Sequence, residues 1–283
     1  MSGLLGIPLG ASGSGRARYG RAMGLYFEGR LNAAQLEAYR TASADDSIPP
    51  DPVFAARGLS LPKDTPMTPE TALVALVDEV DRYLGTLTGP GLAEVRAGLA
   101  RWRGGPVTPA APAPRAFRDT HLPVALAALG PTHPALAQAI AAAAPHLSWI
   151  TYDAYDPSLI GEGFRQGHAF ATFVGEDAPM HAQDYDLGLF LIAPQVFYRD
   201  HHHAAPELYA PLTGPHGWRF GPGRPMVVKP AHQPVWNPPH RPHATKVGSV
   251  PFLCLFGWTR DVKEAAQVLP ADDWPELEAL LLG

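Results

Sequence analysis

Histidines and a glutamate with the spacing of metal ligands lie between residues 198 and 209, in the segment Tyr-Arg-Asp-His-His-His-Ala-Ala-Pro-Glu-Leu-Tyr. His201 and His203 are two residues apart, and Glu207 follows four residues after His203. Side chains alternate along an extended strand, so His201 and His203 should point to one face and His202 to the other. Two imidazoles and a carboxylate are three ligands suited to a divalent transition metal. A fourth ligand must come from elsewhere, and the best candidate is His243 in the segment Arg-Pro-His-Ala-Thr-Lys.

A triple histidine also has two simpler interpretations. It could be a purification tag, but tags lie at termini, whereas this run is internal and has strand-like segments on both sides. It could also be a surface loop that binds no metal. Glu207 and Tyr209 follow at a spacing that neither a tag nor a polar loop requires, and this favours the metal site.

The composition excludes several classes of protein. The hydrophobic fraction of 46% is enough for a folded core, and the charged fraction of 17% is too small for a disordered polyelectrolyte. The net charge of −5, without a basic run, argues against a nucleic-acid partner. The single cysteine, Cys254, cannot form a disulfide within the chain. No apolar stretch reaches membrane-spanning length and the start of the chain does not read as a secretory signal, so we expect a soluble, cytoplasmic protein.

Short strands are expected in the half of the chain that carries most of the histidines. Nine of the 12 histidines follow residue 160, and seven lie from His201 to His243. From residue 147 onward, about ten short apolar or alternating runs are separated by Gly, Pro, Asp and Asn. Such runs without helices between them are typical of an antiparallel sandwich or barrel.

The first half of the chain is expected to be helical. Thr68, Pro69 and Glu70 read as an N-cap, a proline at the first helical position and an acid in the first turn. Further helical segments are expected up to Pro145. The predicted organisation is a helical region over residues 1–146, with residues 1–15 disordered, and a β-barrel over residues 147–283 that ends in a short helix.

The order of the motifs resembles that of the cupin superfamily. His-x-His, three residues, Glu and then Gly214 are similar to the first cupin signature, and the proline-rich stretch from Pro234 to His243 is similar to the second. Four further segments are similar to the dimethylsulfoniopropionate lyase and lyase-like cupins: Ala-Pro-Gln-Val-Phe-Tyr, Ala-Pro-Glu-Leu-Tyr, Pro-His-Ala-Thr-Lys and Phe-Gly-Trp-Thr-Arg-Asp. The resemblance covers roughly residues 147–262. It implies a double-stranded β-helix of jelly-roll type with the metal inside the barrel.

The resemblance also implies roles for individual residues. The metal ligands would be His201, His203, Glu207 and His243. Tyr209 matches the proposed catalytic base of the family, and Tyr198 matches a second active-site tyrosine. Trp258 matches an aromatic residue near the substrate, and its spacing of fifteen residues after His243 is the main reason to prefer His243 over His240 as a ligand. His240 stands where relatives can carry an aromatic residue, so we place it among the substrate-binding residues.

These residue types suit the reaction that the resemblance implies. Elimination of dimethyl sulfide from dimethylsulfoniopropionate removes a proton next to a carboxylate and leaves acrylate. A divalent metal can hold that carboxylate and spread the developing charge, and a tyrosine near it can act as the base. Aromatic faces attract the sulfonium, and Trp258, Tyr198 and Trp236 could line that end of the pocket. Buried Trp and Tyr are also common in barrel cores, which is the structural alternative for each.

Other readings of the same ligands remain open at this point. The chain could be a metallocupin of another class, such as an iron-dependent dioxygenase or an isomerase acting on a small carboxylate, or a cupin that binds a ligand without turnover. The ligand types suit Zn, Fe, Mn, Co or Ni and do not select among them. We expect a small-molecule substrate and a possible homodimer.

Overall fold

The chain divides into two compact units, which are described here one at a time. A computed structural model describes residues 9–10, 12–27, 30–61 and 68–283. The units are Met1–Met67 and Thr68–Gly283. The expected disorder of residues 1–15 falls partly outside the described residues, and the first helix begins within it, at Ser14.

The described residues of the first unit form the helices α1 (Ser14–Phe27), α2 (Ala33–Ala42) and α3 (Pro50–Ala56). Asn32 and Gln35 form a capping box at the start of α2, in which each side chain accepts a hydrogen bond from the other residue's backbone N–H. The helices enclose a small apolar cluster that includes Leu25, Tyr39 and Phe54.

The helices of the second unit fall mainly before its strands. They are α4 (Pro69–Leu84), α5 (Leu92–Trp102), α6 (Ala116–Leu129), α7 (Pro134–Ala143), the 3-10 helix η1 (Ala144–His146), α8 (Pro157–Ile160), α9 (Glu162–Gln166) and α10 (Trp274–Ala279). The expected N-cap of α4 is confirmed, because the Thr68 side chain accepts a hydrogen bond from the backbone N–H of Thr71. The change from helices to strands after His146 and the boundary between the two units therefore fall at different places in the chain.

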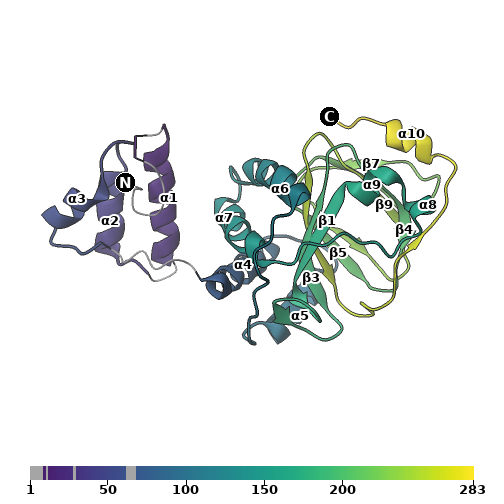
Figure 1. Cartoon of the computed structure of the whole chain (residues 1–283), viewed down its shortest axis with the longest axis horizontal. Helices are drawn as coiled ribbons and strands as arrows, with labels where there is room; N and C mark the ends of the chain where they lie inside the picture. The colour runs from purple at the N-terminus through teal and green to yellow at the C-terminus, as the bar shows by residue number, and fades with distance from the viewer. Residues whose placement is uncertain (1–8, 11, 28–29, 62–67) are drawn as a thin grey trace. The chain divides into compact units, whose positions relative to one another are not determined.

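Two sheets make up the rest of the second unit (Figure 1). The six-stranded sheet has the order β2-β1-β3-β10-β5-β8, and the five-stranded sheet has the order β11-β4-β9-β6-β7. The strands are β1 (His168–Gly175), β2 (Met180–His181), β3 (Asp186–Ile192), β4 (Phe197–His202), β5 (Glu207–Pro211), β6 (His216–Arg219), β7 (Val227–Lys229), β8 (Val235–Asn237), β9 (His243–Lys246), β10 (Phe252–Trp258) and β11 (Gln267–Val268). Apart from the parallel pair β1 and β2, these strands pair antiparallel. The fold is mainly β with helices before the barrel, a cupin-type jelly roll, and this confirms the expected fold class.

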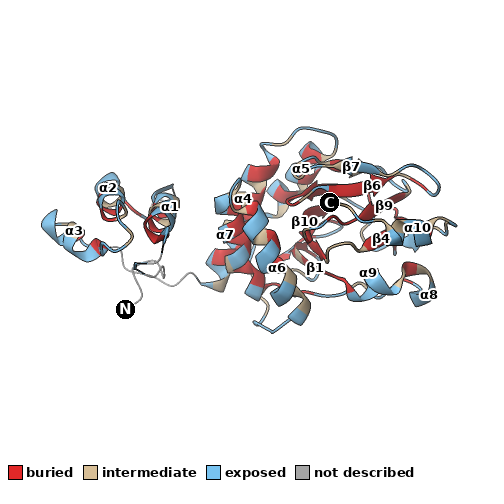
Figure 2. Cartoon of the chain, turned by 90° about the horizontal axis from the view of Figure 1, so that it is seen from above, coloured by how far each residue is buried: buried red, intermediate tan, exposed pale blue. Residues whose placement is uncertain are grey.

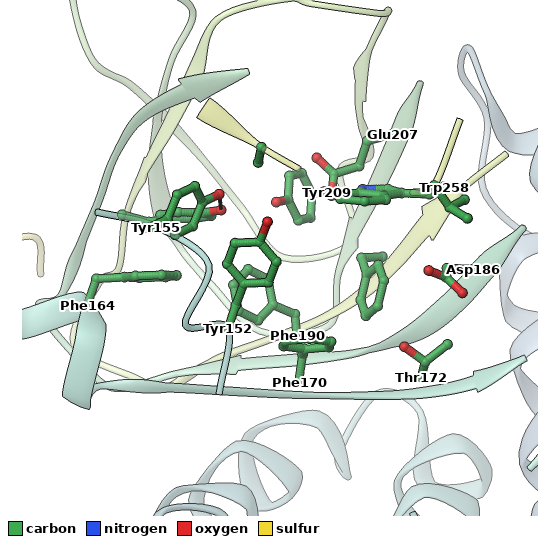
Figure 3. Close-up of a pocket in the computed structure, with 14 residues that line it drawn as sticks. Tyr152, Tyr155, Phe164, Phe170, Thr172, Asp186, Phe190, Glu207, Tyr209 and Trp258 are labelled. Carbon is green, nitrogen blue, oxygen red and sulfur yellow. Dashed lines mark hydrogen bonds between the residues drawn. The ribbon is translucent and has the colours of Figure 1, made fainter. Parts of the chain in front are cut away.

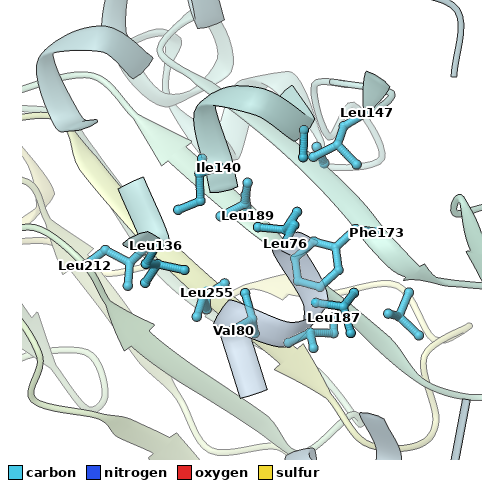
Figure 4. Close-up of a cluster of buried hydrophobic side chains, with 14 of the residues drawn as sticks. Leu76, Val80, Leu136, Ile140, Leu147, Phe173, Leu187, Leu189, Leu212 and Leu255 are labelled. Carbon is cyan, nitrogen blue, oxygen red and sulfur yellow. The ribbon is translucent and has the colours of Figure 1, made fainter. Parts of the chain in front are cut away.

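Helices α4 to α7 cover the outer face of the six-stranded sheet (Figures 1 and 2). Alternate residues of its strands, such as Leu189 on β3 and Leu255 on β10, pack against helix residues such as Leu76 and Ile140 (Figure 4). This outer cluster is almost entirely aliphatic, which suits close packing of helices on a sheet.

The inner faces of the two sheets enclose a second cluster, which is rich in aromatic rings. Phe190 and Tyr209 reach it from the six-stranded sheet, and Tyr198 and Trp218 reach it from the five-stranded sheet. Cys254 is buried in this cluster as a free thiol. Because side chains alternate along a strand, β3, β5 and β10 each supply one set of residues to the outer cluster and the other set to the inner one.

Helices long and apolar enough to cross a membrane are absent from the part of the chain that the structure describes.

Candidate active site

Four predicted ligands meet between the two sheets. His201 on β4 lies directly opposite His243, the first residue of β9, in the antiparallel register of the five-stranded sheet. His203 follows the end of β4, and Glu207 begins β5 in the other sheet. All four side chains are buried. His202 points to the opposite side, as the alternation predicts, and its ring lies 5.6 Å from that of His240.

Backbone carbonyls fix the orientation of each of the three buried histidines. Nδ1 of His201 lies 2.8 Å from the carbonyl oxygen of Arg199. Nδ1 of His203 lies 2.7 Å from that of Ala205, and Nδ1 of His243 lies 2.8 Å from that of Arg241. A carbonyl can only accept, so each Nδ1 carries a proton, and each Nε2 points into the cluster, where it could bind a metal. Such an orienting hydrogen bond is characteristic of histidines that ligate metals.

The Nε2 atoms converge, and two of the three have no hydrogen-bond partner among the described residues. One ring nitrogen of each histidine lies within 4.8 Å of those of the other two. The Nε2 atoms of His201 and His243 are buried and have no hydrogen-bond partner among the described residues. Buried polar atoms are seldom left unpaired, so this arrangement fits a bound cation.

Glu207 completes the cluster. One of its carboxylate oxygens, Oε2, lies 3.0 Å from Nε2 of His203 and 3.3 Å from Nε2 of His243. The other, Oε1, accepts a hydrogen bond of 2.8 Å from the indole N–H of Trp258. Burial alone would raise the pKa of Glu207, but the charge and hydrogen bond of His203 lower it below its ordinary value. The anionic oxygen therefore faces the histidines, and the four side chains, called here the histidine–glutamate cluster, fit a divalent transition metal.

Tyr209 lies close to this cluster on β5. Its ring centroid is 6.0 Å from that of His243, and the side chain is buried. Burial, followed by the negative charge of Glu207, raises the pKa of Tyr209 well above its ordinary value. The phenol therefore stays protonated unless a positive charge stands close to it.

Tyr198 lies on the other side of the cluster, on β4. Its ring stacks on His201 and on Phe164, with centroid distances of 3.9 Å in both cases. Its hydroxyl shares a hydrogen bond with the hydroxyl of Tyr155. Burial raises the pKa of Tyr198 well above its ordinary value. The stacking holds His201 in place. The hydroxyls of Tyr155 and Tyr198 are polar groups in the lining of the adjoining cavity.

A cavity of about 190 Å³ adjoins the cluster and is called here the aromatic pocket (Figure 3). The rings that line it are those of Tyr152, Tyr155, Phe164, Phe170, Phe190, Tyr198, Tyr209, Phe256 and Trp258. Its polar side chains include those of Thr172, Asp186 and Glu207. The pocket thus places the carboxylate of Glu207 beside a wall of aromatic rings.

Of the residues predicted to be catalytic or to bind substrate, Tyr209, Tyr198 and Trp258 line the pocket, but Trp236 and His240 do not. Trp236 pairs with Leu208 across β5 and β8, so it lies on the outer face, where its ring packs against Gly91. His240 is exposed in a turn with a φ of 57°, and its N–H donates to the carbonyl of His203. The structure therefore does not bring these two side chains to the site.

Several lining residues were missed from the sequence. Phe190 and Phe256 share the inner face with Tyr209, but this follows from the pairing of β3, β10 and β5, which spacing in the sequence does not give. Asp186 is the first residue of β3 and follows the same alternation. Tyr152 and Tyr155 lie before helix α8, outside the strands, and no spacing in the sequence points to them.

Comparison with known proteins places these features in a family. Residues 111–254 match the dimethylsulfoniopropionate lyase family. The dimethylsulfoniopropionate lyase DddQ of Ruegeria pomeroyi is 27% identical over 174 residues, which cover 61% of this chain and 81% of that protein. The crystal structure of DddQ from Ruegeria pomeroyi has a TM-score of 0.48 and 23% identity, and the match covers 69% of this chain and 94% of that one. A cupin-like protein from Thermotoga maritima has a TM-score of 0.35 and 13% identity, over 47% of this chain and 99% of that one. The family match spans half of the chain, and the chain therefore belongs to the dimethylsulfoniopropionate lyase family.

Proposed function

We propose that the protein is a metal-dependent lyase that cleaves dimethylsulfoniopropionate to dimethyl sulfide and acrylate. The observation that carries this proposal is the meeting of the histidine–glutamate cluster, Tyr209 and the aromatic pocket in one cavity. The substrate has a carboxylate at one end and a sulfonium at the other, and these ends need a cationic and an aromatic environment, respectively. The pocket offers both next to a group that can accept a proton.

The ligands in this proposal are His201, His203, Glu207 and His243, around one divalent ion of Zn, Fe, Mn, Co or Ni. When bound, the ion would supply Lewis-acid stabilisation of the substrate carboxylate and a positive charge that favours the phenolate of a nearby tyrosine. Three neutral imidazoles and one carboxylate leave such an ion with a net positive charge. An anionic substrate group is therefore attracted to the cluster.

Tyr209 is the proposed base. In its phenolate form, Tyr209 takes the proton from the carbon next to the substrate carboxylate, and the electron pair of that C–H bond forms the new carbon–carbon double bond. The bond from the third carbon to sulfur breaks at the same time, and its electrons leave with dimethyl sulfide. The products are acrylate, dimethyl sulfide and a protonated Tyr209, which returns its proton to water for the next turnover.

The remaining pocket residues orient the substrate and exclude water. Trp258 holds Oε1 of Glu207 through its indole N–H and presents its ring to the cavity. Tyr198 stacks on His201 and shares a hydroxyl hydrogen bond with Tyr155, so it fixes one ligand and one wall together. The aromatic faces can contribute about 0.5–2 kcal/mol each to the attraction of a sulfonium.

Anaerobic incubation with dimethylsulfoniopropionate tests the proposal. Metal-loaded protein is expected to release dimethyl sulfide into the headspace and acrylate into solution in equal amounts, without consumption of oxygen. Protein stripped with a chelator should be inactive until one of the five ions is added back. Tyr209→Phe should keep its metal and lose about 10²–10⁴-fold in kcat, since it removes the base and leaves the ring in place.

Two other outcomes would contradict the proposal. Absence of dimethyl sulfide with every ion would exclude this substrate, and turnover that requires oxygen would indicate a dioxygenase.

A homodimer and a cytoplasmic location also remain predictions. Light scattering of the purified protein tests the oligomeric state.

A further inference from the structure

We propose that Asp186 selects the charge of the ligand, because its carboxylate receives the cationic end of a molecule whose carboxylate end is held at the histidine–glutamate cluster. This inference rests on the proposed function for the identity of the substrate, a sulfonium carboxylate. It adds a specificity-determining residue on β3 of the six-stranded sheet. His201 and His243, by contrast, lie on the five-stranded sheet.

Asp186 lines the same cavity as Glu207 and Tyr209. It begins β3 and lies opposite Trp258 in the antiparallel pairing of β3 with β10. Figure 3 shows Asp186 and Thr172 together at one end of the pocket, with Tyr155 and Phe164 at the other end. The pocket therefore contains two carboxylates in different places, one within the cluster and one outside it.

The carboxylate of Asp186 has no basic partner. Within residues 68–283, the ion pairs and side-chain hydrogen bonds do not include one to this carboxylate. The charged groups around it are acidic, namely Glu176, Asp177 and Asp184. One of these acids, Glu176, forms an ion pair of 3.0 Å with Lys263.

The backbone leaves room for this carboxylate. A Cβ atom added at Gly175 would overlap Oδ1 of Asp186, so a side chain at position 175 would displace the carboxylate. Burial, followed by the charges of the three neighbouring acids, raises the pKa of Asp186 to about 6. At neutral pH the group is therefore mostly ionised even though its surroundings oppose the charge.

A carboxylate in such surroundings is stabilised by a cationic ligand. Placing an ionised group against apolar surface without a partner costs free energy, and a cation beside it recovers part of that cost. A sulfonium has no hydrogen-bond donors, so it suits a carboxylate flanked by rings better than one that needs a hydrogen bond. Phe170, Phe256 and Trp258 line this pocket and add cation–π attraction. A neutral thioether of the same shape would gain neither interaction.

Ligand binding by Asp186→Asn measures this selection directly. The substitution removes the charge and keeps the size of the side chain. Two unreactive ligands are compared by calorimetry on metal-loaded protein at pH 7.5: the cationic 3-(trimethylammonio)propanoate and the neutral 3-(methylthio)propanoate. We expect the variant to bind the cationic ligand about tenfold or more weakly, as the loss of one nearby charge pair at intermediate dielectric implies. Its affinity for the thioether should stay within about twofold, which is the range expected when no charge pair is lost.

Glu176→Gln is the matched control. It also removes one negative charge from the neighbouring acids Glu176, Asp177, Asp184 and Asp186. Glu176, however, does not line the aromatic pocket, and its side chain is paired with Lys263. At an ionic strength of 0.15 M, screening should limit its effect on either ligand to about twofold. Metal content and the thermal unfolding midpoint of both variants report whether the pocket remains assembled.

The outcomes separate this inference from the proposed function. The role of Asp186 would be overturned if Asp186→Asn bound both ligands equally more weakly, or if it bound both as tightly as the unchanged protein does. The same conclusion follows if the unchanged protein does not bind the cationic ligand more tightly than the thioether. Because the measurement needs no turnover, charge selection can hold in a protein that releases no dimethyl sulfide. Conversely, lyase activity with no selection would leave the proposed function intact and remove only Asp186.

Discussion

The two faces of the six-stranded sheet differ in chemistry although they share the same backbone. On the outer face, Leu187, Leu189 and Leu191 of β3 pack beneath the helices in an aliphatic cluster. On the inner face, Asp186 and Phe190 of the same strand line the aromatic pocket. Strand β5 repeats the division, with one set of alternate residues in the outer cluster and the other in the histidine–glutamate cluster and the pocket.

This difference separates stability from chemistry along a single strand. The outer face excludes water mainly with aliphatic side chains, so its contribution is largely apolar burial, at about 25 cal/mol per Å². The inner face lies against the histidine–glutamate cluster, whose buried polar atoms are unpaired or share one carboxylate, and such groups oppose folding unless a ligand or an ion joins them. Substitutions on the two faces should therefore affect different measurements.

The largest effect is expected inside the barrel, from His243→Ala on β9 of the five-stranded sheet, which lies across from Glu207 on the inner face of the six-stranded sheet. The variant loses one ligand, so it should bind the ion more weakly and lose at least about 10³-fold in kcat/KM, which corresponds to about 4 kcal/mol. Metal content after dialysis and headspace dimethyl sulfide measure the two changes. His181→Ala, at an exposed histidine, is the matched control and should keep both. Full activity of the metal-free His243→Ala variant would remove the cluster from the mechanism.

On the outer face, Leu255→Ala should lower the free energy of unfolding by about 2–5 kcal/mol, because it opens a cavity beneath the helices. Leu255 is buried and its β10 neighbours Cys254 and Phe256 point to the inner face. The kcat/KM of the folded, metal-loaded variant should stay within about threefold of the unchanged protein, since no atom of the pocket is removed. Urea denaturation gives the first value and steady-state kinetics the second. A tenfold rise in KM would show that packing on the outer face sets the shape of the pocket.

A third effect, of intermediate size, is expected from pH. The pKa of Asp186 is raised to about 6, first by burial and then by Glu176, Asp177 and Asp184. Below this value the carboxylate is protonated and neutral, so the attraction for a sulfonium is lost as the pH falls. Between pH 7.5 and pH 5, KM should rise by about tenfold, the change in the ionised fraction of a group with this pKa.

The pH profile of Asp186→Asn is the control for this effect. Its KM should be high at pH 7.5 and should lack the component that titrates near pH 6. Buffers of constant ionic strength keep the screening of the neighbouring acids unchanged. If the variant retained the full pH dependence of KM, another group would be responsible for it.

Local signals made much of the fold and the ligand cluster predictable from the sequence. The cap at Thr68 and the apolar positions of α4 act within one turn of a helix, and the alternation His201–His203 acts within one strand. His243 was expected to be a ligand from the family resemblance and from its spacing of fifteen residues before Trp258, and the register of β4 with β9 places it opposite His201. The proline-rich sequence of residues 47–66 predicts a linker, and helix α3 (Pro50–Ala56) within it was therefore missed.

The walls of the pocket depend on pairing between distant strands, and this could not be read from spacing. Asp186 and Phe190 become pocket residues only because β3 lies beside β10. Trp236 was expected among the substrate-binding residues on its aromatic character. Its pairing with Leu208 turns it to the outer face instead. An aromatic residue in a barrel strand therefore needs its register before it can be assigned to a site.

The smallest effects are expected from the two residues that lie outside the pocket. His240→Ala removes an exposed imidazole and keeps the backbone N–H that donates to His203, so kcat and KM should change by less than about twofold. Trp236→Phe keeps an aromatic ring on the outer face beside Gly91 and should also leave kinetics unchanged, with a loss of stability of about 1 kcal/mol. Both variants are compared with Trp258→Phe. The indole N–H of Trp258 donates to Glu207, and its loss should lower kcat/KM by about tenfold or more. If Trp236→Phe lowered kcat/KM as much as Trp258→Phe, the division of the sheet into a structural and a functional face would be wrong.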